Sequence, residues 1–169
     1  WIAYNLGAID FAGGTAVHIN AGAAALALAL VLGKRIGFAK GVAKPHNVPL
    51  VLLGAGLLWF GWFGFNAGSA LAVNTTMVVA AVNTMVAAAT GAIGWVAVEW
   101  WKDKHPTLLG AGSGIVAGLV AITPACAFVD VYAAMIIGFV AGAVCVAGLR
   151  WKYKVGVDDS FDVAGIHGV

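Results

Sequence analysis

Long apolar stretches with almost no charged side chains restrict the fold of this chain more than any other feature. A transmembrane helix needs about 20 mostly apolar residues to cross about 30 Å of hydrocarbon. Five stretches fit this requirement, approximately residues 11–32, 49–73, 77–101, 108–126 and 131–151, and a sixth begins near Val163. The fourth is short and closes on Thr123-Pro124, so we expect its end to be broken or re-entrant. The pattern predicts an all-α, polytopic transmembrane helix bundle.

The composition excludes the main alternatives to a membrane protein. Of the 169 residues, 62% are hydrophobic and 9% are charged, whereas a soluble domain has about 25% charged residues. A disordered chain would leave 7 tryptophans and 8 phenylalanines in water. The net charge of +2 comes without a basic stripe, so no nucleic-acid partner is expected. Cys126 and Cys145 lie in apolar surroundings without a metal or disulfide pattern, which predicts free thiols, no metal and no cofactor.

Positive charges are confined to alternate loops. All 9 lysines and arginines lie in or beside residues 33–48, 102–107 and 150–162, and none lies near residues 74–76 or 127–130. Because successive loops lie on opposite sides of a membrane, the positive-inside rule places the three basic loops in the cytoplasm. The sequence therefore predicts a multi-pass protein of the cell membrane whose first span enters from outside.

Glycines recur at four-residue spacing within the apolar stretches. They form the sets Gly64/Gly68, Gly110/Gly114/Gly118 and Gly138/Gly142. Small residues four apart let membrane helices approach closely. We therefore expect these glycines to lie at helix–helix contacts.

Four ionisable side chains in or next to the predicted spans are candidate functional residues, namely Asp10, His18, Glu99 and His167. Such a side chain costs about 2.5–3.5 kcal/mol at the centre of a membrane helix. Glu99 lies within one helical turn of Lys102, so we expect it to reach the interface and pair with that lysine. His18 and His167 are the strongest candidates, because two neutral imidazoles can hold or pass a proton between them.

One run of residues carries a resemblance to a known family. Residues 10–22, DFAGGTAVHINAG, resemble the signature DFAGGxxVHxxAG of the ammonium transporter family (Amt/Mep/Rh). Further blocks resemble the family in the same order, namely GKRIG at 33–37, KPHN at 44–47, GWFGFNAGS at 61–69, TPAC at 123–126 and DDSFDVAGIHGV at 158–169. Together they cover essentially the whole chain and are more similar to the Amt branch than to the Rh branch.

The resemblance implies an architecture and partners. Members of the family have eleven helices in two pseudo-symmetric halves of five plus a final helix. Residues 1–169 would then be a single partial transporter domain, truncated at both ends, running from the fifth helix to the beginning of the tenth. The implied partners are ammonium, ammonia and methylammonium as substrates, membrane lipid, two further copies in a homotrimer, and a cytoplasmic regulator of the P-II type.

The resemblance also implies roles for individual residues. His18 and His167 are similar to twin histidines that share a hydrogen bond inside a narrow hydrophobic pore and relay a proton. Ser69 is similar to a hydroxyl that holds ammonium in an outer vestibule. Phe65 is similar to one of two phenyl rings that close the pore beneath that vestibule.

Three further residues complete the implied site. Trp62 is expected to line the pore beside the histidines, and Thr123 to lie close to the outer pore. Asp10 is similar to an aspartate that has been interpreted both as an ammonium-recognition residue and as a structural anchor. We favour the anchor, because a carboxylate at the start of a helix satisfies otherwise unpaired backbone amides.

Together, these expected residue roles predict transport of ammonium across the membrane. Ammonium would be captured outside, deprotonated on entry and conducted as ammonia, because removing the charge removes most of the desolvation cost. No nucleophile–base pair or carboxylate pair lies in the spans, so an enzyme is not expected. The alternatives are an electroneutral Rh-like gas channel and an ammonium sensor or transport-competent receptor. A haem protein that uses His18 and His167 as ligands is the least favoured.

Overall fold

The computed structural model describes residues 5–38 and 45–169, and every regular element within them is helical. The α-helices are α2 (Gly14–Leu32), α3 (Val48–Asn66), α4 (Thr75–Asp103), α5 (Leu108–Ile122), α6 (Val131–Val155) and α7 (Val163–His167), with a short 3₁₀ helix η2 (Gly68–Ala70) after α3. Lys40 and Lys44 of the first basic loop lie outside the described residues. The all-α prediction is confirmed.

Four of the five expected spans are long enough to cross a membrane. They are Gly14–Leu32, Val48–Ala70, Thr75–Asp103 and Val131–Val155. The break expected at the end of the fourth stretch is confirmed, because α5 has 15 residues and ends at Ile122, whereas the expected bound at residue 126 is wrong. The backbone then turns, as the Thr123-Pro124 pair predicts, because Pro124 has no backbone N–H to donate to the next helical hydrogen bond. The sixth stretch begins at Val163, as expected.

A side chain from α4 stabilises the turns after α5. Asn83 donates through Nδ2 to the carbonyl oxygens of Cys126 and Val129, both at 2.8 Å. Buried carbonyl groups that leave a helix need such partners, because an unpaired one costs about 1–3 kcal/mol. The non-helical backbone is therefore held inside protein rather than exposed to lipid.

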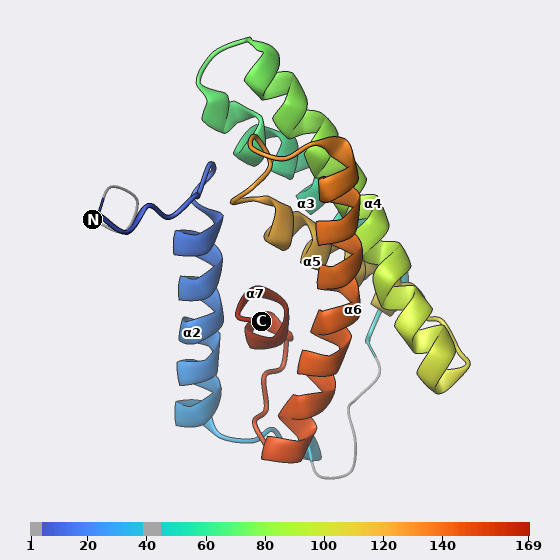
Figure 1. Ribbon diagram of the computed structural model, residues 1–169. Helices are drawn as coiled ribbons and strands as arrows, with labels where there is room; N and C mark the ends of the chain where they lie inside the picture. Colours follow the sequence, from blue (N-terminus) through green and yellow to red (C-terminus); the bar gives the residue numbers. More distant parts are fainter. Residues whose placement is uncertain (1–4, 39–44) are drawn as a thin grey trace.

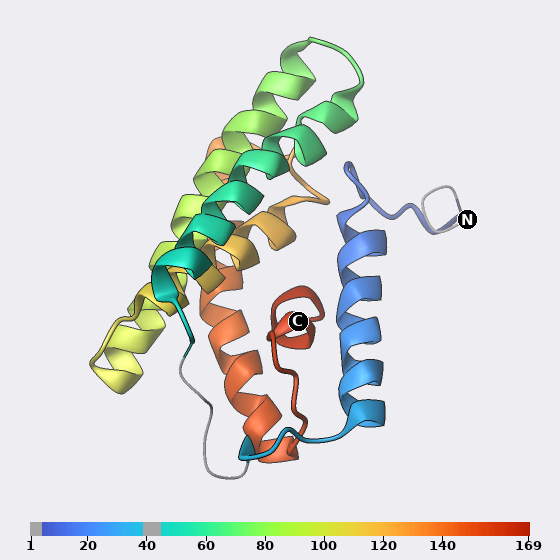
Figure 2. The ribbon, with the colours of Figure 1, turned by 180° about the vertical axis from the view of Figure 1, so that it is seen from behind.

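Helices α4, α5 and α6 form a tightly packed unit, with α5 largely buried inside the protein (Figures 1 and 2). Glycines set the contacts: a Cβ added at Gly118 would overlap the Ala87 carbonyl and lie 3.2 Å from Ala88 Cα. Gly138 and Gly142 of α6 press in the same way against the backbone of α4. The prediction of close contacts is confirmed at these positions.

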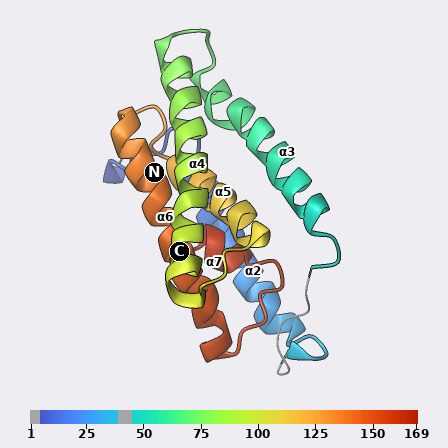
Figure 3. The same cartoon turned by 90° about the vertical axis from the view of Figure 1, so that its right-hand side faces the viewer.

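The glycine prediction fails on α3. A Cβ at Gly64 or Gly68 would meet no described atom within 4 Å. The partner glycines for α5 come instead from α4, where Gly91 lies against the backbone of Gly114 and Gly118. Figure 3 shows that α3 joins α4 at one end and diverges from it toward the other.

Helices α2 and α7 lie beside this unit. In Figure 1, α2 runs along one side, α6 along the other, and the short α7 sits between them. The described ends of the basic loops lie at the same lower end of the bundle, while residues 71–74 and 123–130 lie at the upper end. The alternation of charged and uncharged loops is therefore reproduced in space.

Glu99 does not pair with Lys102, so that prediction is wrong. Its carboxylate accepts hydrogen bonds from Thr107 N at 2.7 Å, from Thr107 Oγ1 and from Trp95 Nε1. The sequence reasoning considered only neighbours on the same helix, whereas the turn between α4 and α5 brings Thr107, the N-cap of α5, onto the carboxylate.

We expect Gly118→Ala to lower the free energy of unfolding by about 2 kcal/mol, because the added methyl group overpacks the contact with Ala87. The matched control is Gly56→Ala on α3, where a Cβ meets no described atom within 4 Å and the change should stay within about 0.5 kcal/mol. Thermal unfolding in detergent, followed by tryptophan fluorescence, measures both. Equal melting temperatures for the two variants would contradict this packing.

Candidate functional site

Two histidines from opposite ends of the sequence meet inside the protein. His18 of α2 and His167 of α7 share a hydrogen bond of 2.9 Å between their Nδ1 atoms. Their ring centroids are 5.0 Å apart, and the ring planes are inclined by 42°. One Nδ1 must donate and the other accept, so the two neutral rings adopt different tautomers. Exchanging those roles requires protons to move, and the contact is therefore suited to proton transfer.

Aromatic side chains of α3 enclose His18. The indole of Trp62 stacks on the imidazole at a centroid distance of 5.3 Å and an angle of 13°. Phe65 meets the same ring edge-on, with centroids 6.0 Å apart and an angle of 81°. Trp62 and Phe65 lie three positions apart on one helix, so their side chains share a face.

Trp62 is held in place by Thr123. The indole Nε1 donates to Thr123 Oγ1 at 2.7 Å, and that hydroxyl donates in turn to the Leu119 carbonyl oxygen at 2.7 Å. Both side chains are buried. Because Thr123 is the first residue after α5, the break in that helix brings its hydroxyl to the tryptophan.

His18 is buried, with 6% of its surface exposed, and its Nε2 has no hydrogen-bond partner among the residues that the structure describes. The lack of a partner is a cost to the fold, because a buried polar atom without a hydrogen bond destabilises by about 1–3 kcal/mol. An unsatisfied ring nitrogen in an apolar setting can bind a small molecule that both donates and accepts hydrogen bonds.

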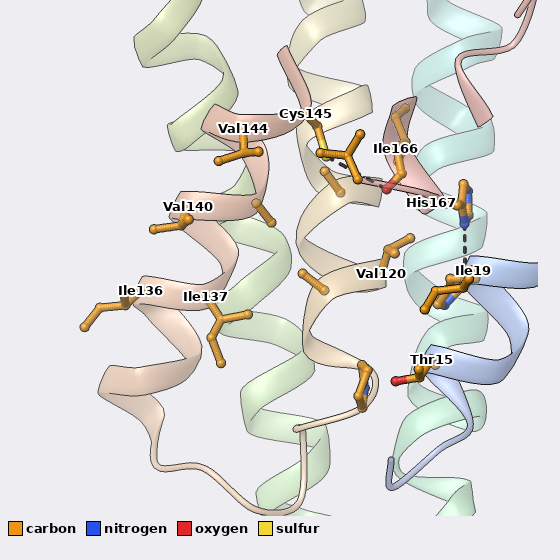
Figure 4. Close-up of a pocket in the computed structure, with 17 residues that line it drawn as sticks. Thr15, Ile19, Val120, Ile136, Ile137, Val140, Val144, Cys145, Ile166 and His167 are labelled. Atoms are coloured by element: carbon orange, nitrogen blue, oxygen red, sulfur yellow. Dashed lines mark hydrogen bonds between the residues drawn. The ribbon is translucent and has the colours of Figure 1, made fainter. Parts of the chain in front are cut away.

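An apolar cavity of about 520 Å³ adjoins the two histidines. Figure 4 shows its walls: Thr15 and Ile19 come from α2, Val120 from α5, and His167 from α7. The wall formed by α6 is aliphatic, with the labelled residues Ile136, Ile137, Val140 and Val144. Apart from the histidine pair, this lining offers little to an ion that must be hydrated.

Ser69 lies just beyond Phe65, on η2. Its hydroxyl donates to the Phe65 carbonyl oxygen at 2.7 Å. A serine hydroxyl has one hydrogen and two lone pairs, so this bond leaves Ser69 Oγ as a free acceptor. The side chain is thus prepared to receive a hydrogen bond from a cationic donor.

Asp10 lies at the start of α2. Its two carboxylate oxygens accept hydrogen bonds from the backbone amides of Thr15 at 3.2 Å and Ala16 at 3.3 Å. Both amides belong to the first turn of the helix, where no intrahelical partner exists. This geometry supports the anchor interpretation.

Asp159 is a site residue that the sequence reasoning missed. Its carboxylate accepts from the amides of Val163 at 3.2 Å and Ala164 at 2.8 Å, at the start of α7. Asp159 precedes His167 by the same eight positions that separate Asp10 from His18. That repeated spacing was the available signal. Each histidine is therefore carried by a helix whose first turn is capped by an aspartate.

Of the three ion pairs that the described residues form at the end of the bundle with the basic loops, two involve the segment before α7. Arg35 binds Asp158, and its hydrogen bonds hold the pKa of the Asp158 carboxyl below its usual range and raise the pKa of the guanidinium. Lys152 pairs with Asp162, where burial raises the carboxyl pKa and the lysine opposes that rise. The sequence alone did not predict either pair.

The structure thus brings five of the seven predicted site residues together. His18, His167, Trp62, Phe65 and Thr123 form one connected cluster. Ser69 joins it through Phe65, whereas Asp10 acts at the start of α2 and touches none of the aromatic rings. Within residues 5–38 and 45–169, no group of three or more His, Cys, Asp or Glu side chains is arranged to hold a metal ion.

Comparison with known proteins gives consistent results. The model of the Ammonium Transporter Family matches residues 1–169. The chain is 56% identical over 167 residues to an ammonium transporter of Mycobacterium tuberculosis H37Rv, covering 99% of this chain and 35% of the relative. It is 54% identical over 171 residues to an ammonium transporter of Bacillus subtilis, covering 100% of this chain and 41% of the relative.

A solved structure agrees with these matches. The crystal structure of Saccharomyces cerevisiae Mep2 superimposes with a TM-score of 0.89 at 42% identity, covering 97% of this chain and 38% of that chain. The chain therefore spans 35–41% of the length of these two curated relatives.

The bond between Trp62 and Thr123 can be measured by a double-mutant cycle. We expect Trp62→Phe and Thr123→Val to show a coupling of about 1 kcal/mol in the free energy of unfolding, because each single change leaves one buried partner unpaired. Thr90→Val is the matched control, since the Thr90 hydroxyl bonds only within its own helix, to Val86 and Ala87. The changes in unfolding free energy for Thr90→Val and Trp62→Phe should be additive. If the changes for Trp62→Phe and Thr123→Val are additive too, the two side chains do not stabilise each other.

Proposed function

Because the chain belongs to the ammonium transporter family, we propose that it is the part of an ammonium transporter that carries the proton-relay pair and one wall of the pore. The transported species inside the membrane is ammonia, and the proton released from ammonium passes along His18 and His167. The observation that carries the proposal is the hydrogen bond between these two rings beside an apolar cavity.

The physical reason for the proposal is the cost of moving an ion through this lining. An isolated ammonium-type ion loses many kcal/mol of hydration in an apolar medium unless the protein replaces its water. Among the described residues that line the cavity, the polar side chains are those of the histidine pair, Thr15 and the weakly polar thiol of Cys145. Ammonia avoids this cost because it is neutral, and the unpaired Nε2 of His18 can hydrogen-bond to it. Potassium cannot lose a proton and is rejected.

Capture occurs above the histidines, at Ser69 and the aromatic rings. The free lone pairs of Ser69 Oγ accept a hydrogen bond from ammonium. A nearby ring face attracts the cation by about 0.5–2 kcal/mol, depending on hydration, and Phe65 supplies such a ring between Ser69 and His18. Phe65 then separates the site of capture from the path of ammonia. Asp10 serves as the anchor of α2.

We also infer how the protein is oriented in the membrane and what it binds. The end of the bundle with the three basic loops faces the cytoplasm, by the positive-inside rule. The working unit is a homotrimer in membrane lipid that also accepts methylammonium. The loop that begins at Lys34 and ends at Asn47 belongs to the cytoplasmic face that a P-II type regulator would contact.

Transport is favoured over the other functions that the sequence left open. Both curated relatives named above are described as ammonium transporters, which argues against a sensor as the primary role. An electroneutral Rh-like channel differs in one measurable respect, since a proton relay moves charge whereas passage of the gas alone does not. Current during an ammonium jump separates the two.

We expect His18→Ala/His167→Ala to lose selectivity for ammonium over potassium, because the widened path then holds water and no longer requires deprotonation. The test is charge movement in liposomes that contain the full-length protein, after a jump in ammonium or potassium concentration. The matched control is His46→Ala/His105→Ala, which alters two exposed loop histidines and should leave selectivity unchanged. Wild-type selectivity in His18→Ala/His167→Ala would contradict the proposed proton relay.

We expect Ser69→Ala to raise the KM for ammonium about tenfold with little change in the maximal rate, because about 1.4 kcal/mol of binding is lost before the transport step. Ser69→Thr keeps the hydroxyl and should restore the KM. Ser160→Ala, in an exposed loop, is the control. Initial rates of methylammonium uptake measure all three, and an unchanged KM in Ser69→Ala would remove Ser69 from the capture site.

A further inference from the structure

Among the elements that this chain contains, helix α2, which carries His18, contacts α5 and α7. At its upper end, Phe11 N donates to the Pro124 carbonyl oxygen at 2.8 Å, and Gly14 packs against Thr123 and Pro124. At mid-length it touches α7 through the two histidines and through Gly22, where an added Cβ would lie 2.8 Å from Gly168 Cα. The contact between Gly22 and Gly168 is a close van der Waals contact.

The lower half of α2 makes no comparable contact with the residues that the structure describes. Residues 23–32 are exposed or half-exposed along their whole length. Figure 2 shows this part of α2 standing apart from α6, with only the loop after it crossing toward the lower end of α6. At this end, two contacts among the described residues attach the loop after α2: Arg35 binds Asp158, and the Phe38 ring stacks on Tyr153 of α6 with centroids 5.9 Å apart.

Arg35 and Asp158 form a three-point contact. Arg35 Nε donates to Asp158 Oδ2 at 2.8 Å, Nη2 donates to Oδ1 at 2.6 Å, and the backbone amide of Arg35 donates to Oδ2 at 2.7 Å. The Asp158 side chain is only 1% exposed, although the arginine remains 47% exposed. A bidentate arginine–carboxylate pair fixes relative orientation as well as distance.

Asp158 is in turn rigidly connected to His167. The neighbouring Asp159 caps α7 through the amides of Val163 and Ala164. Lys152 of α6 donates to the Asp159 carbonyl oxygen at 2.8 Å and pairs with Asp162 at the start of α7. The loop that Arg35 grips is therefore the same short segment that sets the position of α7.

We propose that Arg35 and Asp158 are positioning residues that hold His18 in hydrogen-bond contact with His167. The expected effect on the transport rate rests on the proposed function, whereas the expected effect on the histidine contact does not. Helix α2 acts as a lever fixed near Gly14. His18 lies about 6 Å and Leu32 about 27 Å from that point, at 1.5 Å per residue. A displacement of about 4–5 Å at Leu32 therefore moves His18 by about 1 Å, enough to break a hydrogen bond.

The test uses the full-length protein with Arg35→Ala, Asp158→Ala, the conservative Arg35→Lys and the exchange Arg35→Asp/Asp158→Arg. Cryo-electron microscopy reads the separation of His18 and His167, and reconstituted liposomes give the KM and maximal rate for ammonium. Arg150→Ala/Asp103→Ala is the matched control, because that ion pair ties α6 to α4 at the same end of the bundle and touches neither α2 nor α7.

We expect Arg35→Ala and Asp158→Ala to separate the histidines by 1 Å or more, an order set by the lever estimate of about 1 Å. The maximal rate should fall about tenfold or more at an unchanged KM, since misplacement of reacting groups by about 1 Å carries penalties of this size. Arg35→Lys and the exchange variant should recover part of the rate, and the Arg150→Ala/Asp103→Ala control should match the wild type.

Two results would overturn the inference: histidines that stay in contact in Arg35→Ala, or an equal loss of rate in the Arg150→Ala/Asp103→Ala control. If Arg35→Ala or Asp158→Ala unfolds in detergent, Arg35→Lys takes its place. An unchanged histidine contact and an unchanged maximal transport rate in Arg35→Lys would then contradict the proposal. If the wild type carries no ammonium while the histidines of Arg35→Ala separate, the proposed function fails and the positioning role stands.

Discussion

The absence of water from the membrane interior is the constraint on which the rest of this structure depends. Every backbone amide and carbonyl group there needs a partner within the protein, and the starts of helices are where amides are most often unpaired. Asn47, Asn74, Thr107 and Asp130 each cap a helix by accepting from the amide three residues on. Asn83 does the equivalent for the broken end of α5.

Among the described residues, three buried side-chain atoms lack a hydrogen-bond partner, namely His18 Nε2, Trp59 Nε1 and Asn66 Oδ1, and the first of them belongs to the site. His18 Nε2 is buried and unpaired, although the same ring makes a strong contact through Nδ1 and is stacked on Trp62. The surrounding structure holds this arrangement from three directions: Asp10 caps α2, Asp159 caps α7, and Thr123 orients the tryptophan. An unsatisfied ring nitrogen in an apolar setting is what a carrier of a small neutral hydrogen-bonding molecule requires, and it also explains why so many well-satisfied groups surround it.

Much of the fold could be predicted from the sequence, because apolar length and charge position act locally. The stretches that became α2, α3, α4 and α6 and the start of α7 at Val163 were all visible as apolar runs with polar ends. The misses have a common physical cause. Glu99 binds Thr107 rather than Lys102. A Cβ added at Gly64 would meet no described atom within 4 Å, although a neighbouring helix was expected there. Both outcomes depend on how separate helices lie relative to one another. Likewise, the shortness of α5 follows from turns that a side chain of α4 stabilises.

By itself, the sequence determined that the protein is a helical membrane protein, which loops share one side, and that His18 and His167 are the ionisable groups to explain. These properties follow from hydropathy and charge, which each residue carries wherever it lies. The family resemblance implied that His18 and His167 share a hydrogen bond with Trp62 beside them. Only the tertiary structure gave the 2.9 Å distance between the Nδ1 atoms, the stacking of Trp62 on His18 and the contact of Arg35 with the loop before α7. Contacts between residues separated by 123 and 149 positions depend on helix crossings and close glycine packing, and no local pattern in the chain encodes them.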